Sequence, residues 1–272
     1  MNGVTWQSQD PPVARPPAGV RDWARVMLRV PPIALVLTGG LGLLLALRLF
    51  ERPLRRKDRP LSPRVTVAVC RIVLRLLGLR WQVEGPEDPA ARLVVANHVS
   101  WLDIFVLNAR GPVYFVAKSE VAGWPGIGLL ARATGTVFIA RDRRQAAAQA
   151  ARLRDRLAAG HRLVLFPEGT SSDGRRVLRF RSAMFAALRD LPGLRVQPVT
   201  LAYRAPPGCD PRFHGWWGDM DLAPHLLQVL AAPRGGAVRI IRHPAIAAAA
   251  GRKALALDSE AAVRAGLEQA LD

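Results

Sequence analysis

Cysteine is scarce in this sequence, and the residue spacings that mark metal centres are missing. Cys70 and Cys209 are the two cysteines, and they lie far apart and outside any motif. This argues against a disulfide framework and against redox or zinc chemistry based on thiolates. A Gly-x-Ser-x-Gly turn, the mark of one large class of serine hydrolases, is also missing. We therefore predict neither a bound metal nor a bound cofactor.

Acidic residues are few compared with basic ones. The chain has 39 lysines and arginines against 21 aspartates and glutamates, which gives a formal net charge of +18. Such an excess predicts an anionic partner, either a nucleic acid or an anionic membrane surface. The sequence lacks zinc-finger spacing, a helix-turn-helix pattern and a platform of basic and aromatic residues. We therefore expect an anionic membrane as the partner, and no nucleic acid.

An uncharged segment near the N-terminus supports the membrane prediction. Residues 30–47 are 18 residues without a charge, about the minimum length for a helix that spans a bilayer. Basic residues flank both ends, more densely on the C-terminal side, which predicts that the following domain lies in the cytoplasm. A hairpin that re-enters the same leaflet is an alternative, because Pro31-Pro32 and nearby glycines permit a bend. A buried helix of a soluble domain is a further alternative.

A second apolar segment, residues 61–81, is interrupted by arginines on one side. Arg64, Arg71 and Arg75 are seven and four residues apart, so they share one helical face. Valine, isoleucine and leucine occupy the other face, which predicts an amphipathic helix at the membrane interface. A helix packed on its own domain is the alternative. We predict three parts of the chain: a disordered basic N-terminus over residues 1–29, a membrane-associated helical segment over 30–82, and the main domain over 83–272.

Short apolar runs alternate with helical patterns throughout residues 83–272. This alternation predicts an α/β fold, with a mixed, mostly parallel sheet and helices on both of its faces. The membrane helix and the amphipathic helix precede this domain. The expected strands cover residues 93–96, 112–117, 136–140, 162–166, 196–203 and 237–242, and the expected helices cover residues 145–159 and 182–190.

A histidine and an aspartate follow the first of these strands at a spacing that suits general-base catalysis. His98 stands at the strand end, and Asp103 can fold back onto one ring nitrogen if the intervening residues turn into a helix. The other nitrogen can then accept the proton of a substrate hydroxyl, so that the substrate itself is the nucleophile. The same spacing also fits a histidine that is hydrogen-bonded near a helix N-terminus and has no catalytic role.

Two further segments can contribute to a binding site. Residues 166–174 read Phe-Pro-Glu-Gly-Thr-Ser-Ser-Asp-Gly, and such a turn allows main-chain amides to converge on an anion or a carbonyl group. Glu168 can bind an acceptor or support the site, although a plain strand-to-helix turn has the same spacing. The strand at 136–140 leads into Arg141, which can hold a phosphate or a carboxylate. A solvated arginine is the alternative there.

Together and in this order, these segments resemble the lysophospholipid acyltransferase family. The Asn-His-x4-Asp block from Asn97 to Asp103 resembles its first block, and residues 135–141, 166–172 and 196–199 resemble the other three. The resemblance implies that the histidine of the first block is the base and that the aspartate orients it. It also implies a larger set of residues that hold the substrates: Asn97, Lys118, Gly135, Arg141, Phe166, Pro167, Glu168, Gly169, Thr170 and Ser171.

The resemblance implies O-acyl transfer in lipid biosynthesis, as in bacterial 1-acyl-glycerol-3-phosphate acyltransferases. An acyl chain moves from acyl-CoA or acyl-ACP to the free hydroxyl of lysophosphatidic acid and gives phosphatidic acid, at the cytoplasmic face of a bacterial inner membrane. The third block departs from the family, because Ser171 stands where an arginine is usual. This form, together with Trp216-Trp217, resembles the members that acylate lyso-ornithine lipid, which is the alternative acceptor. A lipid or thioester hydrolase and a membrane scaffold without activity are further alternatives.

Overall fold

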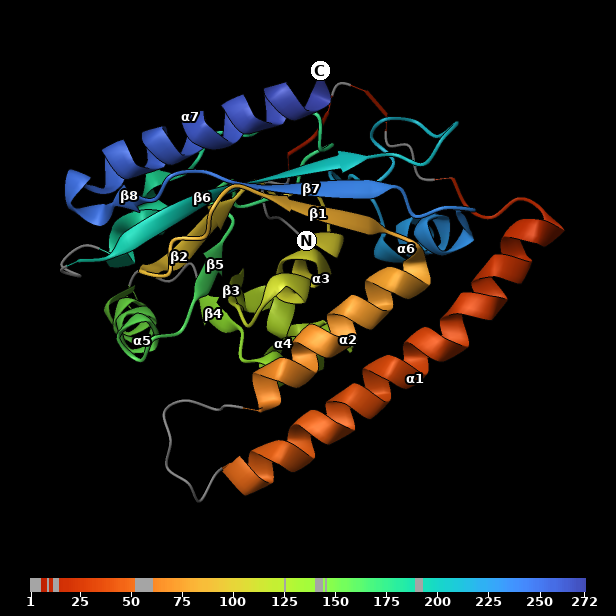
Figure 1. Cartoon of the computed structure of the whole chain (residues 1–272), viewed down its shortest axis with the longest axis horizontal. Coiled ribbons are helices and arrows are strands. Elements are labelled where there is room, and N and C mark those ends of the chain that lie inside the picture. Colours follow the sequence, from red (N-terminus) through yellow and green to blue (C-terminus); the bar gives the residue numbers. More distant parts are fainter. Residues whose placement is uncertain are drawn as a thin grey trace.

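A computed structural model gives the fold of the chain. It describes residues 6–8, 10–11, 15–51, 61–124, 126–139, 144, 146–188 and 193–272. The sheet lies between helices on both of its faces, and a long helical hairpin lies beside it (Figure 1). The predicted α/β class is therefore confirmed.

The hairpin consists of α1 (Val20–Glu51) and α2 (Ser62–Leu77), which pack along each other (Figure 1). By length and composition α1 can cross a membrane, since its most apolar window has a mean hydropathy of 2.2. The helix continues through Pro31 and Pro32, so the bend that we considered at these residues is not formed.

The prediction of a disordered N-terminus is wrong for residues 20–29, which form the first part of α1. Two arginines explain why this part is ordered, because they hydrogen-bond the C-terminal end of α6 (Leu222–Ala231). Arg25 donates to the carbonyl of Ala231 over 3.1 Å, and Arg29 donates to the carbonyls of Leu230 and Ala232 over 2.8 and 2.6 Å. Cations at a helix C-terminus complement its exposed carbonyls and its dipole.

The amphipathic character of α2 is confirmed, and its apolar face is packed on the domain. Val73, Leu74 and Leu77 are buried, whereas Arg71 and Arg75 are exposed on the opposite face. The apolar face meets α3 (Leu102–Arg110), and Arg71 donates to the carbonyl of Ala109 over 2.7 Å. The structure thus shows the alternative in which this helix packs on its own domain.

One mixed sheet forms the centre of the domain. The order of its strands is β1-β7-β6-β2-β5-β3-β4, and β8 pairs with β6 beside this path. Only the β6–β7 and β6–β8 pairs are antiparallel among the described strands, which confirms the mostly parallel sheet. The strands are β1 Arg80–Glu84, β2 Ala91–Ala96, β3 Tyr114–Lys118, β4 Val137–Ile139, β5 Leu163–Leu165, β6 Arg195–Arg204, β7 Ala237–Arg242 and β8 Ile246–Ala247.

The remaining helices differ from expectation in several places. The helix predicted over 145–159 is α5 (Ala146–Ala158), whereas the one predicted over 182–190 is a 3-10 helix, η3 (Ser182–Leu188). The sequence did not predict α4 (Ile127–Thr134), α6 or α7 (Arg252–Leu271). Strand β1 also crosses the predicted boundary between residues 82 and 83 and pairs with β7.

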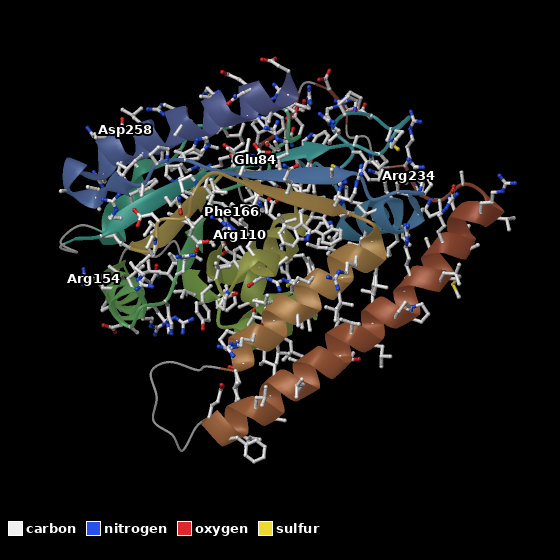
Figure 2. All side chains as sticks on the ribbon, in the orientation of Figure 1. Glu84, Arg110, Arg154, Phe166, Arg234 and Asp258 are labelled. Carbon is white, nitrogen blue, oxygen red and sulfur yellow. The ribbon has the colours of Figure 1, made fainter. Side chains whose placement is uncertain are left out.

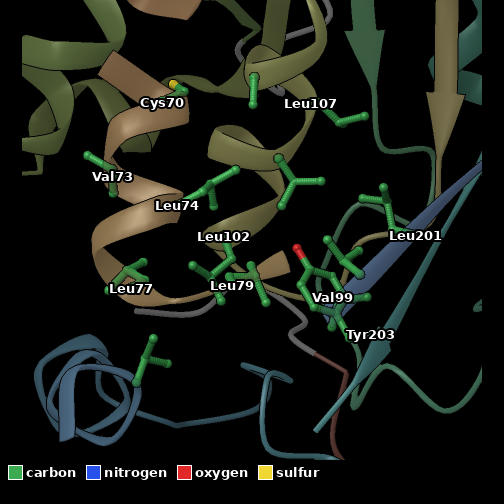
Figure 3. Close-up of a cluster of buried hydrophobic side chains, with 14 of the residues drawn as sticks. Cys70, Val73, Leu74, Leu77, Leu79, Val99, Leu102, Leu107, Leu201 and Tyr203 are labelled. Carbon is green, nitrogen blue, oxygen red and sulfur yellow. The ribbon is translucent and has the colours of Figure 1, made fainter. Parts of the chain in front are cut away.

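Alternation along the central strands builds one core on each face of the sheet. In β2, Leu93 and Val95 face α5 and α7, whereas Val94 and Ala96 face α2 and α3. Figure 3 shows the core on the face of α2 and α3, in which side chains of these helices meet Leu201 and Tyr203 of β6. Because β2 and β5 are parallel neighbours, their carboxyl ends lie side by side, and the first and third sequence blocks follow these two ends.

Candidate active site

His98 follows β2, and Asp103 stands in the first turn of α3. The predicted contact between them is present: Nδ1 of His98 lies 2.7 Å from Oδ2 of Asp103. The same carboxylate oxygen accepts hydrogen bonds from the main-chain amides of Val99 and Ser100, over 2.7 and 3.1 Å. The chain between the two residues therefore closes a tight turn around the carboxylate. This turn fixes the proton of His98 on Nδ1 and leaves Nε2 as the acceptor.

The imidazole of His98 is held from one side by an aromatic ring. Phe166, at the end of β5, stacks on it with ring centroids 4.2 Å apart and an interplanar angle of 14°. The side chain of His98 is 22% exposed, whereas that of Asp103 is fully buried. No residue of the described part of the chain hydrogen-bonds Nε2, so this atom is available to a substrate hydroxyl. The arrangement can act as an oriented general base.

Tyr203 completes this network, and the sequence analysis missed it. Its hydroxyl donates to Oδ1 of Asp103 over 2.8 Å, from β6. Burial, followed by the charge of Asp103, raises the pKa of Tyr203 well above its ordinary value. The hydroxyl therefore stays protonated and remains a donor. A signal was present in the sequence, because strand alternation from Val199 places Leu201 and Tyr203 on the face that carries α3.

The side chain of Asn97 hydrogen-bonds the main chain of the neighbouring strand β6. Its side-chain nitrogen donates to the carbonyl of Leu201 over 3.0 Å, and its side-chain oxygen accepts from the amide of Leu201 over 2.7 Å. The residue is fully buried. We therefore assign Asn97 to positioning His98 at the end of β2, where it joins that strand to β6, and not to direct contact with a substrate.

The third block forms a turn that is packed against the first. The amide of Ser172 donates to the carbonyl of His98 over 2.9 Å, and the amide of His98 donates to Oε1 of Glu168 over 3.2 Å. Glu168 is only 2% exposed, and burial raises the pKa of its carboxyl well above the ordinary range. Gly169 has a φ of 72°, in the left-handed region that glycine adopts most readily. The first and third blocks are thus in direct contact in the structure.

Pro167 and Thr170 flank this turn and bind neighbouring segments. The carbonyl of Pro167 accepts from the amide of Arg181 over 2.9 Å. The hydroxyl of Thr170 lies 3.5 Å from the amide of Trp6, so the N-terminal segment crosses the third block. Trp6 also approaches the ring of Trp217, with centroids 6.4 Å apart.

Ser171 lies beneath the loop that carries the paired tryptophans. Its hydroxyl donates to the carbonyl of Trp216, and the amide of Trp216 donates to the carbonyl of Val99 over 2.9 Å. Ser171 is 8% exposed, so little space surrounds its side chain. The loop therefore occupies the surroundings of position 171, where the family usually has an arginine.

The second block is described only in part. Lys118 ends β3 and is in register with Ile139 of β4. Gly135 is the left-handed C-cap of α4, with a φ of 85°, and its carbonyl accepts from Arg156 over 2.6 Å. Arg141 lies outside the described residues. The predicted roles of Lys118 and Arg141 in holding a substrate therefore stay predictions.

The chain is similar to known acyltransferases. Residues 80–202 match a family model described as Acyltransferase. A lyso-ornithine lipid O-acyltransferase of Rhodobacter capsulatus is 52% identical over 99% of both chains. A 1-acyl-sn-glycerol-3-phosphate acyltransferase of Neisseria gonorrhoeae is 40% identical over 47% of this chain and 50% of its own. The crystal structure of the acyltransferase PlsC from Thermotoga maritima matches the fold with a TM-score of 0.62 and 22% identity, over 91% of this chain and 97% of that one.

Proposed function

This chain belongs to the acyltransferase family and acts on lysolipids, and we propose that its acceptor is lyso-ornithine lipid. The observation that carries this choice is the 52% identity to a lyso-ornithine lipid O-acyltransferase over 99% of both chains. The buried position of Ser171 supports it, because the loop around Trp216 fills the place of the arginine that is usual in the family. Lysophosphatidic acid, the first choice on sequence grounds, becomes the second candidate.

The geometry supports a direct transfer in which the acceptor hydroxyl is the nucleophile. Nε2 of His98 takes the hydroxyl proton while the oxygen attacks the carbonyl carbon of an acyl thioester. The tetrahedral intermediate then collapses, the C–S bond breaks, and the thiolate leaves with the proton that His98 returns. Asp103 stabilises the imidazolium that exists between these steps, and Tyr203 stabilises Asp103. General-base catalysis of this kind contributes about 10²–10⁴-fold to a rate.

We propose coenzyme A or acyl carrier protein as the carrier of the thioester, and the cytoplasmic face of the membrane as the place of reaction. The charge distribution around α1 supports the second statement. Residues 48–59 contain six arginines and lysines, against three in residues 21–29. The denser cluster precedes the catalytic domain and favours its cytoplasmic placement.

Acceptor competition in isolated membranes tests the proposal. Membranes that contain the enzyme are incubated with a labelled acyl thioester and with lyso-ornithine lipid, lysophosphatidic acid or no acceptor. We expect labelled ornithine lipid as the main product, and no product from a His98→Ala variant. Labelled phosphatidic acid alone would support the second candidate. Labelled free acid at the same rate without any lysolipid would identify a hydrolase.

A further inference from the structure

A cavity of about 740 Å³ opens beside the catalytic turn, on the side of the sheet that carries α7. Glu168 and Thr170 line it from the third block. Arg179 and Arg181 line it from the segment that follows this block, and Lys253 lines it from α7. Because the carboxyl of Glu168 also accepts a hydrogen bond from the amide of His98, one side chain links the cavity to the catalytic residue.

Glu168 contributes to the wall of this cavity, but its carboxyl is buried below the surface. Oε1 accepts the hydrogen bond from the amide of His98, and Oε2 is shielded from solvent. The carboxyl therefore holds the catalytic turn in place and leaves the binding of a ligand to the other side chains of the cavity.

Three cations line the cavity from its exposed side. Arg179, Arg181 and Lys253 are exposed, and within the described residues none of them forms an ion pair with an acidic side chain. Arg181 lies against the turn, because a Cβ at Gly169 would lie 3.3 Å from its Cζ. The glycine thus lets the guanidinium lie against the third block. Planar guanidinium groups bind carboxylates through paired hydrogen bonds.

We propose that this cavity binds the amino-acid head of the acceptor, with the head-group carboxylate on Arg181. The inference rests on the proposed acceptor. In an N-acyl ornithine the α-nitrogen is an amide, so the head keeps one carboxylate and one side-chain amine. Arg181 offers the carboxylate a planar guanidinium partner at the edge of the catalytic turn. Arg181 thereby supplies the charge that Ser171 does not.

Steady-state kinetics of Arg181→Gln tests the assignment of the carboxylate. We expect KM for lyso-ornithine lipid to rise at least about tenfold, KM for the acyl thioester to change less than about twofold, and Arg181→Lys to lie between. Arg234→Gln is the matched control. Arg234 is exposed, follows α6 and does not line the cavity (Figure 2), so this variant should keep both constants.

A second arm uses a lyso-ornithine lipid whose carboxylate is converted to an amide. The wild type should lose affinity for this analogue, and Arg181→Gln should hardly distinguish the two lipids. Equal discrimination by both enzymes, or a rise in KM for the thioester alone, would overturn the inference, and the latter would place the donor in the cavity. If the wild type acylates lyso-ornithine lipid and the Arg181→Gln variant is unaffected, only the assignment of the cavity is refuted. A wild type that ignores lyso-ornithine lipid refutes the proposed acceptor as well.

Discussion

The hydroxyl of Tyr203 lies 2.8 Å from Oδ1 of Asp103, while Oδ2 of the same carboxylate binds the ring of His98. Tyr203 and Asp103 are 100 positions apart in the chain, and Asp103 is fully buried between the tyrosine and the histidine. A buried carboxylate needs several donors to remain charged. The tyrosine thus supports the charge that stabilises His98 when it carries the proton.

Replacing Tyr203 with Phe should alter catalysis more than folding. Without the hydroxyl, the less neutralised Asp103 holds the proton of the imidazolium more tightly. We expect kcat to fall about tenfold, the acid-side fall of kcat to move to higher pH, and stability to drop by about 1–3 kcal/mol. The pH dependence of acyl transfer measures this. Tyr114→Phe removes the hydroxyl of the other tyrosine and should leave the profile in place. An unchanged profile in Tyr203→Phe would mean that its hydroxyl has only a structural role.

Replacing Asp103 with Asn should cost about 10²–10⁴-fold in kcat, because an amide favours the wrong tautomer of His98. His98→Ala should cost at least as much. The double variant should be no slower than the slower single variant, since the two residues act as one unit. Acyl transfer into purified membranes measures all three. Independent, multiplying losses would contradict the dyad.

Introducing the usual family arginine as Ser171→Arg should not produce a lysophosphatidic acid acyltransferase. The side chain is buried below Trp216, so an arginine must displace the tryptophan loop or leave its charge buried. We expect a loss of about 2–4 kcal/mol of stability and reduced activity on both acceptors. Ser171→Ala is the control and should keep most activity. A gain of activity on lysophosphatidic acid would show that position 171 can reach the acceptor.

The turn at Gly169 offers a paired test of strain and contact. Gly169 and Gly160 have similar φ values of 72° and 82°, but a Cβ at Gly160 meets nothing within 4 Å. Both alanine variants should lose about 1–2 kcal/mol from left-handed strain. Only Gly169→Ala should also raise KM for the lysolipid, because its Cβ displaces Arg181. Equal kinetics in the two variants would mean that Arg181 has no part in binding.

Stability should decrease when the pH is lowered, because two histidines are buried. Burial lowers the pKa of His214 and of His225 to about 4, below the ordinary value of 6.5. The unfolded chain therefore binds more protons between pH 6.5 and 4, so the stabilisation is complete above pH 6.5 and is lost as the pH falls through this window. We expect up to about 3 kcal/mol for each residue. Tm of the detergent-solubilised enzyme at pH 8, 6.5 and 5 measures it, and a level Tm would contradict it.

Local sequence patterns were enough to predict much of the fold. The apolar runs that became β2, β3, β4, β5, β6 and β7 are short and bounded by turn residues, and the His98–Asp103 contact spans only five positions. Strand β1 escaped prediction because its residues are exposed or half-buried and form no apolar run. The N-terminal part of α1 escaped because its order depends on Arg25 and Arg29 at the end of α6, a contact across about 200 residues.

In the active site, too, the residues that are close in sequence were predicted and those that are brought together by the fold were missed. Sequence motifs identified the base, its carboxylate and the third turn, since each is defined by neighbours in the chain. Tyr203 and Arg181 were missed for different reasons. Tyr203 reaches Asp103 only through the pairing of β6 with β2, and Arg181 is one of 39 basic residues, with nothing local to distinguish it.

The contacts of Arg25 and Arg29 with α6 join α1, which we propose to be the membrane helix, to the catalytic domain. A domain on a loose tether samples many heights and tilts above a bilayer. A domain that is fixed to its membrane helix has one orientation, and the entrance of its active site then stays at one depth in the lipid. The enzyme can therefore search for its acceptor by diffusing sideways within the membrane plane. Its encounter rate should follow the surface density of the lysolipid, and not its concentration in bulk water.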